Sequence, residues 1–167
     1  MLIGWQAPRQ LRLADLQIQD AALNNLSLNV IKGDFLFPDM TYVSLPDNAV
    51  IEARSFENAW KDDGQPLNLY IGLRKWDDSG ENVTVLSQLS DLTEVHTRFV
   101  TTEDPEEVED LYHTGPSAQV KRLSYVLKLF WETEKEQLGD YYLLPIARLE
   151  RMGENVVLSE EFIPPCL

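Results

Sequence analysis

The sequence predicts an all-β fold, an antiparallel β-sandwich with little helix. Apolar and polar side chains alternate over many short runs, as in strands that bury one face. These runs recur about every 8–15 residues and are separated by Gly, Pro and Asp turns. A parallel sheet would show strands alternating with long helical patterns, and the sequence shows no such alternation. The 167 residues suffice for one domain with a full hydrophobic core, so we expect a single sandwich over residues 1–167.

The first half of the chain predicts short strands joined by turns. A helix or loop is expected over residues 15–26. Turns are expected at residues 32–34 and at Pro38-Asp39, because Gly, Pro and Asp favour reversals. A loop is expected over residues 54–66. The expected strands are residues 26–31, 35–37, 41–45 and 49–53.

The second half begins with the clearest strand, residues 67–73, which we expect at the centre of the core. Its leucines and one isoleucine share one parity, with Asn68, Tyr70 and Gly72 opposite. A long strand over residues 119–131 has Leu123 and Trp131 on its core parity and Lys128 on the other. Other strands are expected at residues 83–89 and 92–100. A polar turn is expected at residues 77–82, an acidic connector with about one helical turn at 103–110, and a charged loop at 132–140.

The last 27 residues predict a β-hairpin followed by an extended tail. Residues 141–149 alternate, with Tyr141, Pro145 and Leu149 on one side. A loop of several residues, 150–155, contains Gly153 and allows residues 156–158 to return beside the first strand. Pro164 and Pro165 remove two N–H donors, so the tail is expected to end the sheet.

This closing order, with Phe-Ile-Pro-Pro-Cys-Leu at residues 162–167, resembles the end of the N-terminal shoulder domain of the TssK family. TssK proteins are baseplate subunits of bacterial type VI secretion systems. Trp5 in a Gly-Trp context, the turn at residues 37–41 and the strand at 67–73 follow in the family's order. The resemblance covers roughly residues 4–167, and its specific motif is at the end.

The resemblance implies a non-catalytic adaptor domain, similar in fold to the shoulder of siphophage receptor-binding proteins. It implies that the full-length protein is a TssK homotrimer whose shoulder binds the TssF/TssG wedge. A C-terminal head would reach the membrane-complex proteins TssL and TssM. The family's N-terminal segment, neck and head are not recognised here, so a fragment of the family's chain is expected. Residues 162–165 would then form a rigid strap that directs the next domain.

Composition and charge exclude several other classes of protein. The net charge of −14 disfavours nucleic acid and anionic membrane surfaces as partners. No apolar run is long enough to span a bilayer, and the start is not a signal peptide. The single cysteine, Cys166, fits a reducing compartment, and the resemblance implies a cytoplasmic location at the inner-membrane face. Residues 103–110 hold six acidic and no basic residues, and are either a solvated loop or a patch for a basic partner.

No pattern in the sequence predicts catalysis, a metal or a cofactor. His96 and His113 lack neighbouring ligands at metal-site spacing, so they are interpreted as structural or surface residues. Cys166 has no nearby basic residue to lower its pKa and is interpreted as an incidental thiol. The acidic loops lack the order of a calcium loop. The chain is therefore predicted not to be an enzyme, and its mechanism is assembly.

Candidate partner-binding residues are large apolar side chains near loops and in the tail. Trp60 and Trp76 are either lids on the core or interface anchors. The full set is Trp5, Trp60, Trp76, Phe162, Ile163, Pro164 and Pro165. Two alternatives stay open. A carbohydrate- or other ligand-binding sandwich would show coplanar exposed aromatic rings, and a sandwich hydrolase would show convergent carboxylates or a Cys–His pair.

Overall fold

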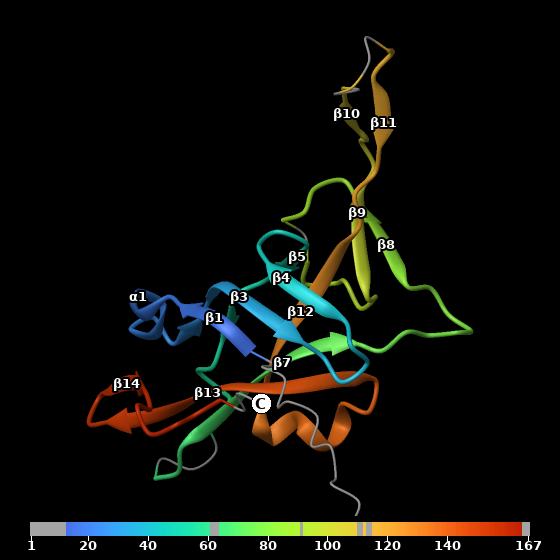
Figure 1. Cartoon of the computed structure of the whole chain (residues 1–167). Coiled ribbons are helices and arrows are strands. Elements are labelled where there is room, and N and C mark those ends of the chain that lie inside the picture. The colour runs from blue at the N-terminus through green and yellow to red at the C-terminus, as the bar shows by residue number, and fades with distance from the viewer. Residues whose placement is uncertain (1–12, 61–63, 91, 110–111, 113–114, 165–167) are drawn as a thin grey trace, which may run out of the picture.

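The computed structural model describes residues 13–60, 64–90, 92–109, 112 and 115–164. Its main sheet has seven strands in the order β14-β13-β7-β12-β9-β8, with β5 also paired to β12 (Figure 1). The strands are β5 (Ala49–Ile51), β7 (Leu67–Arg74), β8 (Val83–Leu86), β9 (Phe99–Thr102), β12 (Ser124–Trp131), β13 (Tyr141–Met152) and β14 (Asn155–Leu158).

A second sheet of three strands, in the order β1-β3-β4, covers one face of the main sheet. Its strands are β1 (Leu13–Ile18), β3 (Val30–Leu36) and β4 (Tyr42–Leu45). The remaining elements are short: α1 (Asp20–Leu23), the pair β2 (Ser27–Leu28) and β6 (Arg54–Ser55), the pair β10 (Glu106–Val108) and β11 (Ala118–Val120), and the 3₁₀ helix η1 (Glu132–Gln137).

The core lies between the two sheets, which makes the molecule a two-layer sandwich. Inward-facing β7 and β12 side chains pack in one cluster with those of β3 and β4, such as Phe35 and Val43. Leu69, Ile71 and Leu73 of β7 are fully buried, as their shared parity predicts. The all-β prediction is confirmed. Most strand pairs are antiparallel, and two, β5–β12 and β8–β9, are parallel.

Strand β13 contains a β-bulge that the sequence pattern did not predict. Pro145 pairs with Tyr70 and Ala147 with Leu69, so Ile146 is an extra residue opposite β7. Because a bulge shifts the alternation by one residue, Leu144 and Ile146 on one side of it and Leu149 on the other are all buried. The expected single parity for residues 141–149 is therefore wrong. Pro145, which has no N–H to donate to the ladder, is tolerated here because it lies at the bulge.

The predicted C-terminal hairpin is confirmed, with a tighter turn than expected. Strands β13 and β14 pair from Leu149–Leu158 to Met152–Asn155, which leaves two residues in the turn. Gly153 has φ +67°, the positive φ that a type II′ turn requires at its first central position. The six-residue loop proposed from the charged run is wrong, because four of those residues pair in the strands.

Several other local predictions differ from the structure. The expected turn at residues 32–34 lies inside β3, where a Cβ on Gly33 would lie 2.6 Å from the Phe35 ring. Gly33 therefore makes room for that ring. The charged segment after Trp131 forms η1 instead of a loop. Residues 92–98, including His96, are not in a strand, and the acidic connector contains strand β10 instead of a helical turn.

A second, smaller core lies beneath the segment that contains His96. Leu92, Val95, Val100 and Val126 are buried together on the outer face of the main sheet, the face turned away from the three-stranded sheet. The long strand predicted over residues 119–131 is divided into β11 and β12, and Leu123 between them is 52% exposed. Trp131 is buried, in agreement with its parity.

Buried Arg98 joins the two sheets. Its guanidinium donates to the Arg74 carbonyl oxygen at 2.9 Å and to Asp39 Oδ2 at 3.1 Å and Thr41 Oγ1 at 2.8 Å. Burial is the largest effect on the pKa of Asp39 and acts to raise it. Hydrogen bonds from Thr41 and Arg98 outweigh burial together and hold that pKa below its ordinary value. The predicted Pro38-Asp39 turn is thus confirmed and fixed from both sides.

Candidate protein-binding surfaces

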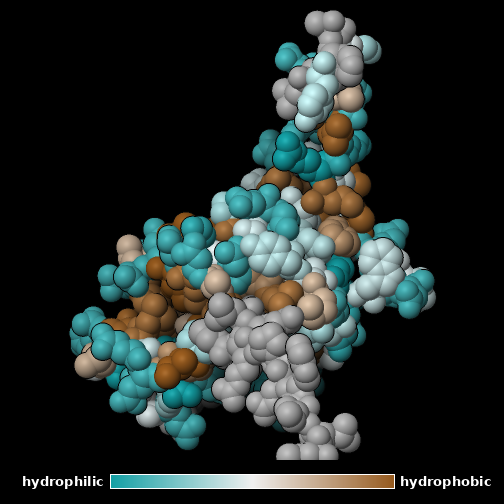
Figure 2. Space-filling model, viewed as in Figure 1, coloured by the Kyte–Doolittle hydropathy of each residue, from teal (hydrophilic) through white to brown (hydrophobic). Residues whose placement is uncertain are grey.

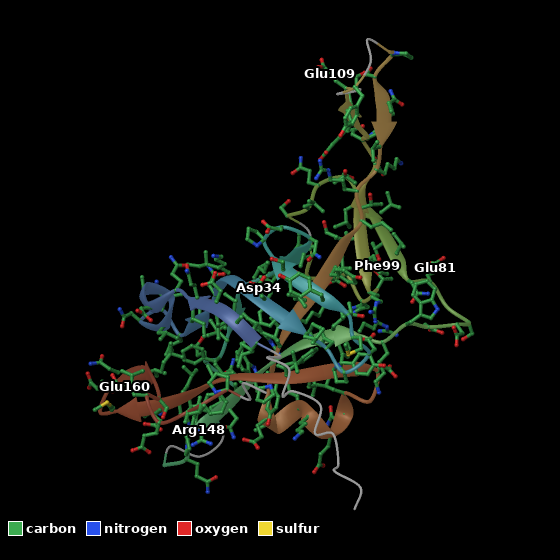
Figure 3. The ribbon with its side chains drawn as sticks, viewed as in Figure 1. Asp34, Glu81, Phe99, Glu109, Arg148 and Glu160 are labelled. Atoms are coloured by element: carbon green, nitrogen blue, oxygen red, sulfur yellow. The ribbon has the colours of Figure 1, made fainter. Side chains whose placement is uncertain are left out.

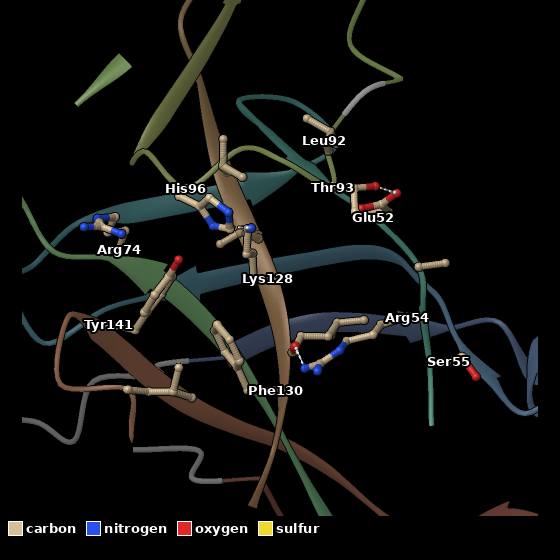
Figure 4. A pocket seen from close by; sticks show the side chains of 15 residues that line it. Glu52, Arg54, Ser55, Arg74, Leu92, Thr93, His96, Lys128, Phe130 and Tyr141 are labelled. Atoms are coloured by element: carbon tan, nitrogen blue, oxygen red, sulfur yellow. Dashed lines mark hydrogen bonds between the residues drawn. The ribbon is translucent and has the colours of Figure 1, made fainter. Parts of the chain in front are cut away.

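A large cavity lies on the outer face of the main sheet, and we name it the Lys128 groove. Its volume is about 570 Å³. Strand β12 forms its floor, and the segments around His96 and Tyr141 form walls (Figure 4). It is lined by Glu52, Ala53, Arg54, Ser55, Arg74, Leu92, Thr93, His96, Val126, Leu127, Lys128, Leu129, Phe130, Leu138 and Tyr141.

An aromatic platform forms one end of the Lys128 groove. The rings of Phe130 and Tyr141 meet edge to face with centroids 4.9 Å apart. Phe130 lies across Gly72 of the neighbouring strand, where a Cβ would come within 2.5 Å of the ring. Gly72 therefore allows Phe130 to lie flat on the sheet. The result is an apolar surface directly beside charged groups, the composition of most ligand-binding clefts.

The charged groups of the groove are mainly cationic, although the whole chain is acidic. Lys128 Nζ is 3.5 Å from His96 Nδ1, and no ion pair between described residues includes Lys128 or Arg74. Burial lowers the pKa of Lys128, and the Glu52 carboxylate acts in the opposite direction. Glu52 itself accepts a hydrogen bond from Thr93 at 2.8 Å. Lys128 and Arg74 thus face the groove without an ion pair to another described residue, although the Glu52 and Glu94 carboxylates act on Lys128 and Arg74 acts on Asp77.

Arg54, at the other end of the groove, is already neutralised. Its guanidinium forms a two-pronged contact with Glu134, with N–O distances of 2.8 and 2.6 Å, and lies 5.0 Å from the Trp131 ring centroid. It also donates to the Leu129 carbonyl oxygen, the dashed contact in Figure 4. Burial acts to raise the pKa of Glu134, but hydrogen bonds from Arg54 and the Trp131 amide lower it overall. Arg54 therefore stabilises the fold.

The sequence pattern did not identify this groove. Lys128 is visible as a cation between Val126 and Phe130 on the outer parity of its strand. Arg74 and Tyr141 are remote in sequence and are adjacent only because β7 and β13 pair, with Tyr141 opposite Arg74. The signal that could have drawn attention to the site is Lys128 itself, a half-buried cation in a chain of net charge −14.

Trp60, one of the predicted anchors, packs as a lid on the main core. The side chain is half-buried and contacts the large hydrophobic cluster. Its Nε1 donates to the Gln65 carbonyl oxygen at 2.7 Å, and the Arg151 guanidinium lies 5.0 Å from its ring centroid. The ring is therefore held from three sides, and its part in partner binding stays a prediction.

Trp76 lies at the opposite end of β13 and is 60% exposed. Its neighbour Lys75 is fixed by a hydrogen bond from its amide to the Asp140 carbonyl oxygen, next to Tyr141, whereas Trp60 contacts Arg151. Ten residues of extended strand separate those two points, roughly 30 Å. Among the described residues no ring pair contains either tryptophan. The coplanar pair that would support a carbohydrate site is not found among them.

The tail residues follow the edge of the β13–β14 hairpin. Phe162 is half-buried, with the Arg148 guanidinium 5.4 Å from its ring centroid. Ile163 is 81% exposed, and Pro164 lines a cavity of about 190 Å³ with Leu16 and Ile146. Trp5 and Pro165, and also His113 and Cys166, lie outside the described residues. The structure therefore places three of the four tail candidates together and leaves their binding role a prediction.

The described part of the chain contains no group of three or more His, Cys, Asp or Glu side chains placed to hold a metal ion. Within the same residues, no helix has the length and hydrophobicity needed to cross a bilayer.

A comparison with protein families gave one match that spans nearly the whole chain. The family model described as "Bacterial Type VI secretion, VC_A0110, EvfL, ImpJ, VasE" matches residues 13–167. A comparison with curated proteins found no significant match.

Solved structures with a similar fold include a chain from the type VI secretion system TssK–TssF–TssG baseplate subcomplex. That likeness has a TM-score of 0.75 at 17% identity and covers 94% of this chain and 49% of that one. A chain of the type VI secretion system baseplate complex has a TM-score of 0.73 at 18% identity, and the likeness covers 96% of this chain and 49% of that one. A crystal structure of TssK has a TM-score of 0.75 at 19% identity, and the likeness covers 97% of this chain and 35% of that one. This chain thus spans half or less of each of these three chains.

Proposed function

Because this chain belongs to the TssK (VasE) family of type VI secretion baseplate proteins, we propose that it is a non-catalytic adaptor domain of the baseplate. In this role it anchors a TssK trimer to the TssF/TssG wedge and so links the baseplate to the membrane complex. The observation that carries the proposal is the common fold over 94% of the chain with a chain of the TssK–TssF–TssG subcomplex.

The proposed mechanism is assembly through preformed surfaces. Trp76 and Ile163 are exposed apolar side chains, and such side chains act as anchors when a partner buries them. The acidic surface supports the choice of a basic partner and speeds its encounter. Trp5, Trp60, Phe162, Pro164 and Pro165 complete the proposed contact and exit residues.

We assign contact with TssL and TssM to the half of the family's chain that this sequence does not span. The 162–165 segment is proposed as the strap that fixes the direction of that half. We further propose that the protein acts at the cytoplasmic face of the inner membrane, where a baseplate joins its membrane complex.

Capture from cells tests the proposed wedge contact. The tagged chain is co-expressed with TssF and TssG from the same type VI cluster, and bound proteins are identified by mass spectrometry. We expect TssF and TssG to be captured together, and their affinity to fall about thirtyfold in Trp76→Ala, because a buried aromatic anchor contributes about 2 kcal/mol. Asn155→Ala, a change of an exposed residue at the start of β14, is the matched control.

The proposed role of this domain would be overturned if full-length protein captures the wedge and this chain does not, although this chain unfolds cooperatively and is therefore folded. The strap is tested separately by Pro164→Ala with Pro165→Ala in the full-length protein. Trimer assembly should then be perturbed, and an unchanged mass by light scattering together with unchanged secretion would contradict the strap.

A further inference from the structure

Strand β8 lies at one end of the main sheet, and its outer edge is unpaired. The strand order ends at β8, which pairs on its other side with β9, in parallel, from Val83–Phe99 to Leu86–Thr102. Figure 1 shows β8 at the border of the molecule, with no described strand beside its outer edge. Such an edge is a row of backbone N–H and C=O groups that can pair with another strand.

The hydrogen bonds on the β9 side show which backbone groups of β8 face outward. The carbonyl oxygens of Asn82 and Leu86 accept hydrogen bonds from that side at 2.9 and 3.0 Å. The backbone groups of successive strand residues point to alternate edges, so the N–H and C=O groups of Val83 and Val85 point away from β9. The outer edge thus offers the donors and acceptors of these two valines.

Strand β8 lacks features by which edge strands avoid pairing with other chains. Edge strands are often protected by charged residues, proline or a β-bulge. Residues 82–90 contain no charged residue and no proline, and the register between β8 and β9 has no shift. By contrast, β1 at an edge of the second sheet contains Asp15 and two register shifts. The outer edge of β8 is therefore open to another strand.

Apolar side chains accompany this edge. Val85 is 53% exposed and Leu89 is 40% exposed. Exposed Trp76 lies near the start of β8, because the amide of the next residue, Asp77, donates to Asn82 Oδ1 at 2.9 Å. Figure 2 shows apolar surface, in brown, at the upper ends of β8 and β9 below the projecting β10–β11 pair. A strand added here would bury apolar area as well as backbone groups.

Both ends of β8 are acidic. Asp78 and Glu81 precede the strand, and Figure 3 shows Glu81 beside its beginning. Glu103 lies at the other end, where its amide donates to the Leu86 carbonyl oxygen at 3.0 Å, and Asp104 follows it. None of these four carboxylates forms an ion pair with another described residue. A neutral strand with basic residues at its ends would complement both acidic ends.

The same charges disfavour a second copy of this chain as the occupant of the edge. Antiparallel pairing of two β8 strands would bring Glu81 of one copy toward Glu103 of the other, and parallel pairing would bring each acidic end to itself. Pairing of β8 with the β14 edge would meet Glu154 and Glu160, which flank that strand. Like charges placed opposite each other are destabilising, so the charges favour a different protein.

We infer that the outer edge of β8 binds an extended segment of a partner protein as an additional strand. The segment is uncharged over the length of β8, has apolar side chains on the face that covers Val85, and carries Lys or Arg at both ends. Backbone hydrogen bonds to Val83 and Val85 provide affinity, as in other cases of recognition by strand addition. The acidic ends and Trp76 provide selectivity.

This inference deepens the proposed function and rests on it in one respect, that this domain works by binding protein. It adds a surface and the chemistry of the segment that the surface takes. It can fail while TssF and TssG still bind elsewhere on the domain, so both proposals are measured in the same variants.

Peptide binding tests the inference on the unchanged chain. The probe is a fluorescent peptide, Thr-Val-Thr-Val-Thr with two lysines at each end, and its binding is followed by fluorescence anisotropy. One control peptide has N-methyl groups on the five central residues, which removes the strand donors and keeps the charge. A second has glutamates in place of the lysines. Each control should bind about tenfold more weakly or worse, because hydrogen bonds and close charge pairs are lost.

Variants of Val85 locate the contact. Val85→Pro removes an outward N–H, which an edge strand tolerates, and should weaken probe binding about tenfold. Val85→Ala keeps that N–H and is the matched control, with an expected loss of about threefold from the smaller side chain. If urea unfolding shows that Val85→Pro is not folded, Val85→Lys replaces it. The added like charge should also weaken binding of the basic probe about tenfold.

Hydrogen exchange measured by NMR gives a reading without any substitution. Binding of the probe should slow the exchange of the Val83 and Val85 amides, because these donors become paired. The amides of Thr84 and Leu86 face β9 and should change little. This pattern distinguishes strand addition from attraction of a basic peptide to an acidic chain.

The inference is overturned if the probe does not bind, if either control peptide binds as tightly, or if exchange at Val83 and Val85 is unchanged by binding. Self-association that protects these two amides without peptide would identify a second copy as the occupant and would also overturn it.

Wedge capture separates the two proposals. A Val85→Pro chain that loses the probe and still captures TssF and TssG supports both. Loss of probe and wedge together in Val85→Pro, with both retained in Val85→Ala, shows that the wedge supplies the strand. An unchanged chain that binds the probe as expected and captures neither TssF nor TssG overturns the proposed function alone.

Discussion

Strands β7 and β10 show how differently two strands of one chain can be stabilised. Strand β7 pairs with a neighbour on each edge and buries Leu69, Ile71 and Leu73 completely. Strand β10 pairs on one edge with β11, and its three residues are all exposed. Both strands form ladder hydrogen bonds, so the difference in their stability comes from the burial of their side chains. The body, formed by the two packed sheets, is therefore a cooperative unit. The β10–β11 pair, which we name the acidic hairpin, is an attachment whose local stability is low.

The largest expected effect comes from the centre of the body. Ile71→Ala should lower the free energy of unfolding by about 3 kcal/mol, because it removes a fully buried side chain and leaves a cavity. Urea unfolding followed by circular dichroism measures the change. Val120→Ala in the acidic hairpin is the control and should change it by less than about 0.5 kcal/mol. Equal effects at the two positions would contradict the comparison.

The next effect concerns the link between the two sheets. Arg98→Ala should cost about 2–3 kcal/mol at pH 7, because Asp39 and the Arg74 carbonyl oxygen lose a buried donor. Urea titrations at pH 7 give this value. Arg122→Ala, which breaks the exposed pair with Glu106, should cost almost nothing. A large cost at Arg122 would show that the acidic hairpin shares the stability of the body.

The same link predicts a pH dependence. The pKa of Asp39 is lowered in the folded chain below the reference value of 3.8, so its contribution is present above about pH 3.8 and is lost as pH falls through the folded pKa. Asp39→Asn should therefore be less stable than the unchanged chain at pH 7 and nearly as stable in strong acid. Parallel unfolding curves at both pH values test this, and a difference that persists in acid would contradict it.

A smaller effect is expected where the body forms the floor of the Lys128 groove. Gly72→Ala should cost about 1–2 kcal/mol, because the added methyl group overlaps the Phe130 ring and contacts Leu143. Thermal unfolding measures the cost. Gly139→Ala is a suitable control, since a Cβ there meets no atom within 4 Å. The combined change Gly72→Ala with Phe130→Leu should recover part of the loss, and no recovery would contradict the overlap.

The smallest effect on stability is expected from the acidic hairpin itself. Replacing residues 105–121 by a short Gly-Ser link should change the free energy of unfolding by less than about 1 kcal/mol, since only exposed surface is removed. Hydrogen exchange adds a direct reading. Amides of β10 should exchange by local opening, and amides of β7 only by global unfolding. Protection of β10 equal to that of β7 in the monomer would contradict the comparison.

The sequence predicted those elements that depend on local pattern. Strand β7 has a period of two over its whole length, and the C-terminal hairpin has a glycine where its turn needs a positive φ. The closing motif also led to the correct family. These signals lie within a few adjacent residues, so they can be recognised without knowledge of the fold.

What the sequence did not predict depends on partners far along the chain. The bulge at Ile146 exists in relation to β7, and no feature of residues 141–149 alone distinguishes it from regular alternation. Gly33 was interpreted as a turn because its actual role, space for the Phe35 ring, is visible only in the packed strand. The Lys128 groove needs β7, β12 and β13 side by side before Arg74, Lys128 and Tyr141 become neighbours.

Strand β12 gives the molecule a mechanical path from its tip to its centre. Its first residues pair with β9 directly below the acidic hairpin, and its last five pair with β7 in the middle of the sheet. A force that pulls on the projection acts along this strand, so the hydrogen bonds to β7 are loaded together in shear and are not opened one after another. A force applied at the tip is thus distributed over the central strands of the sandwich.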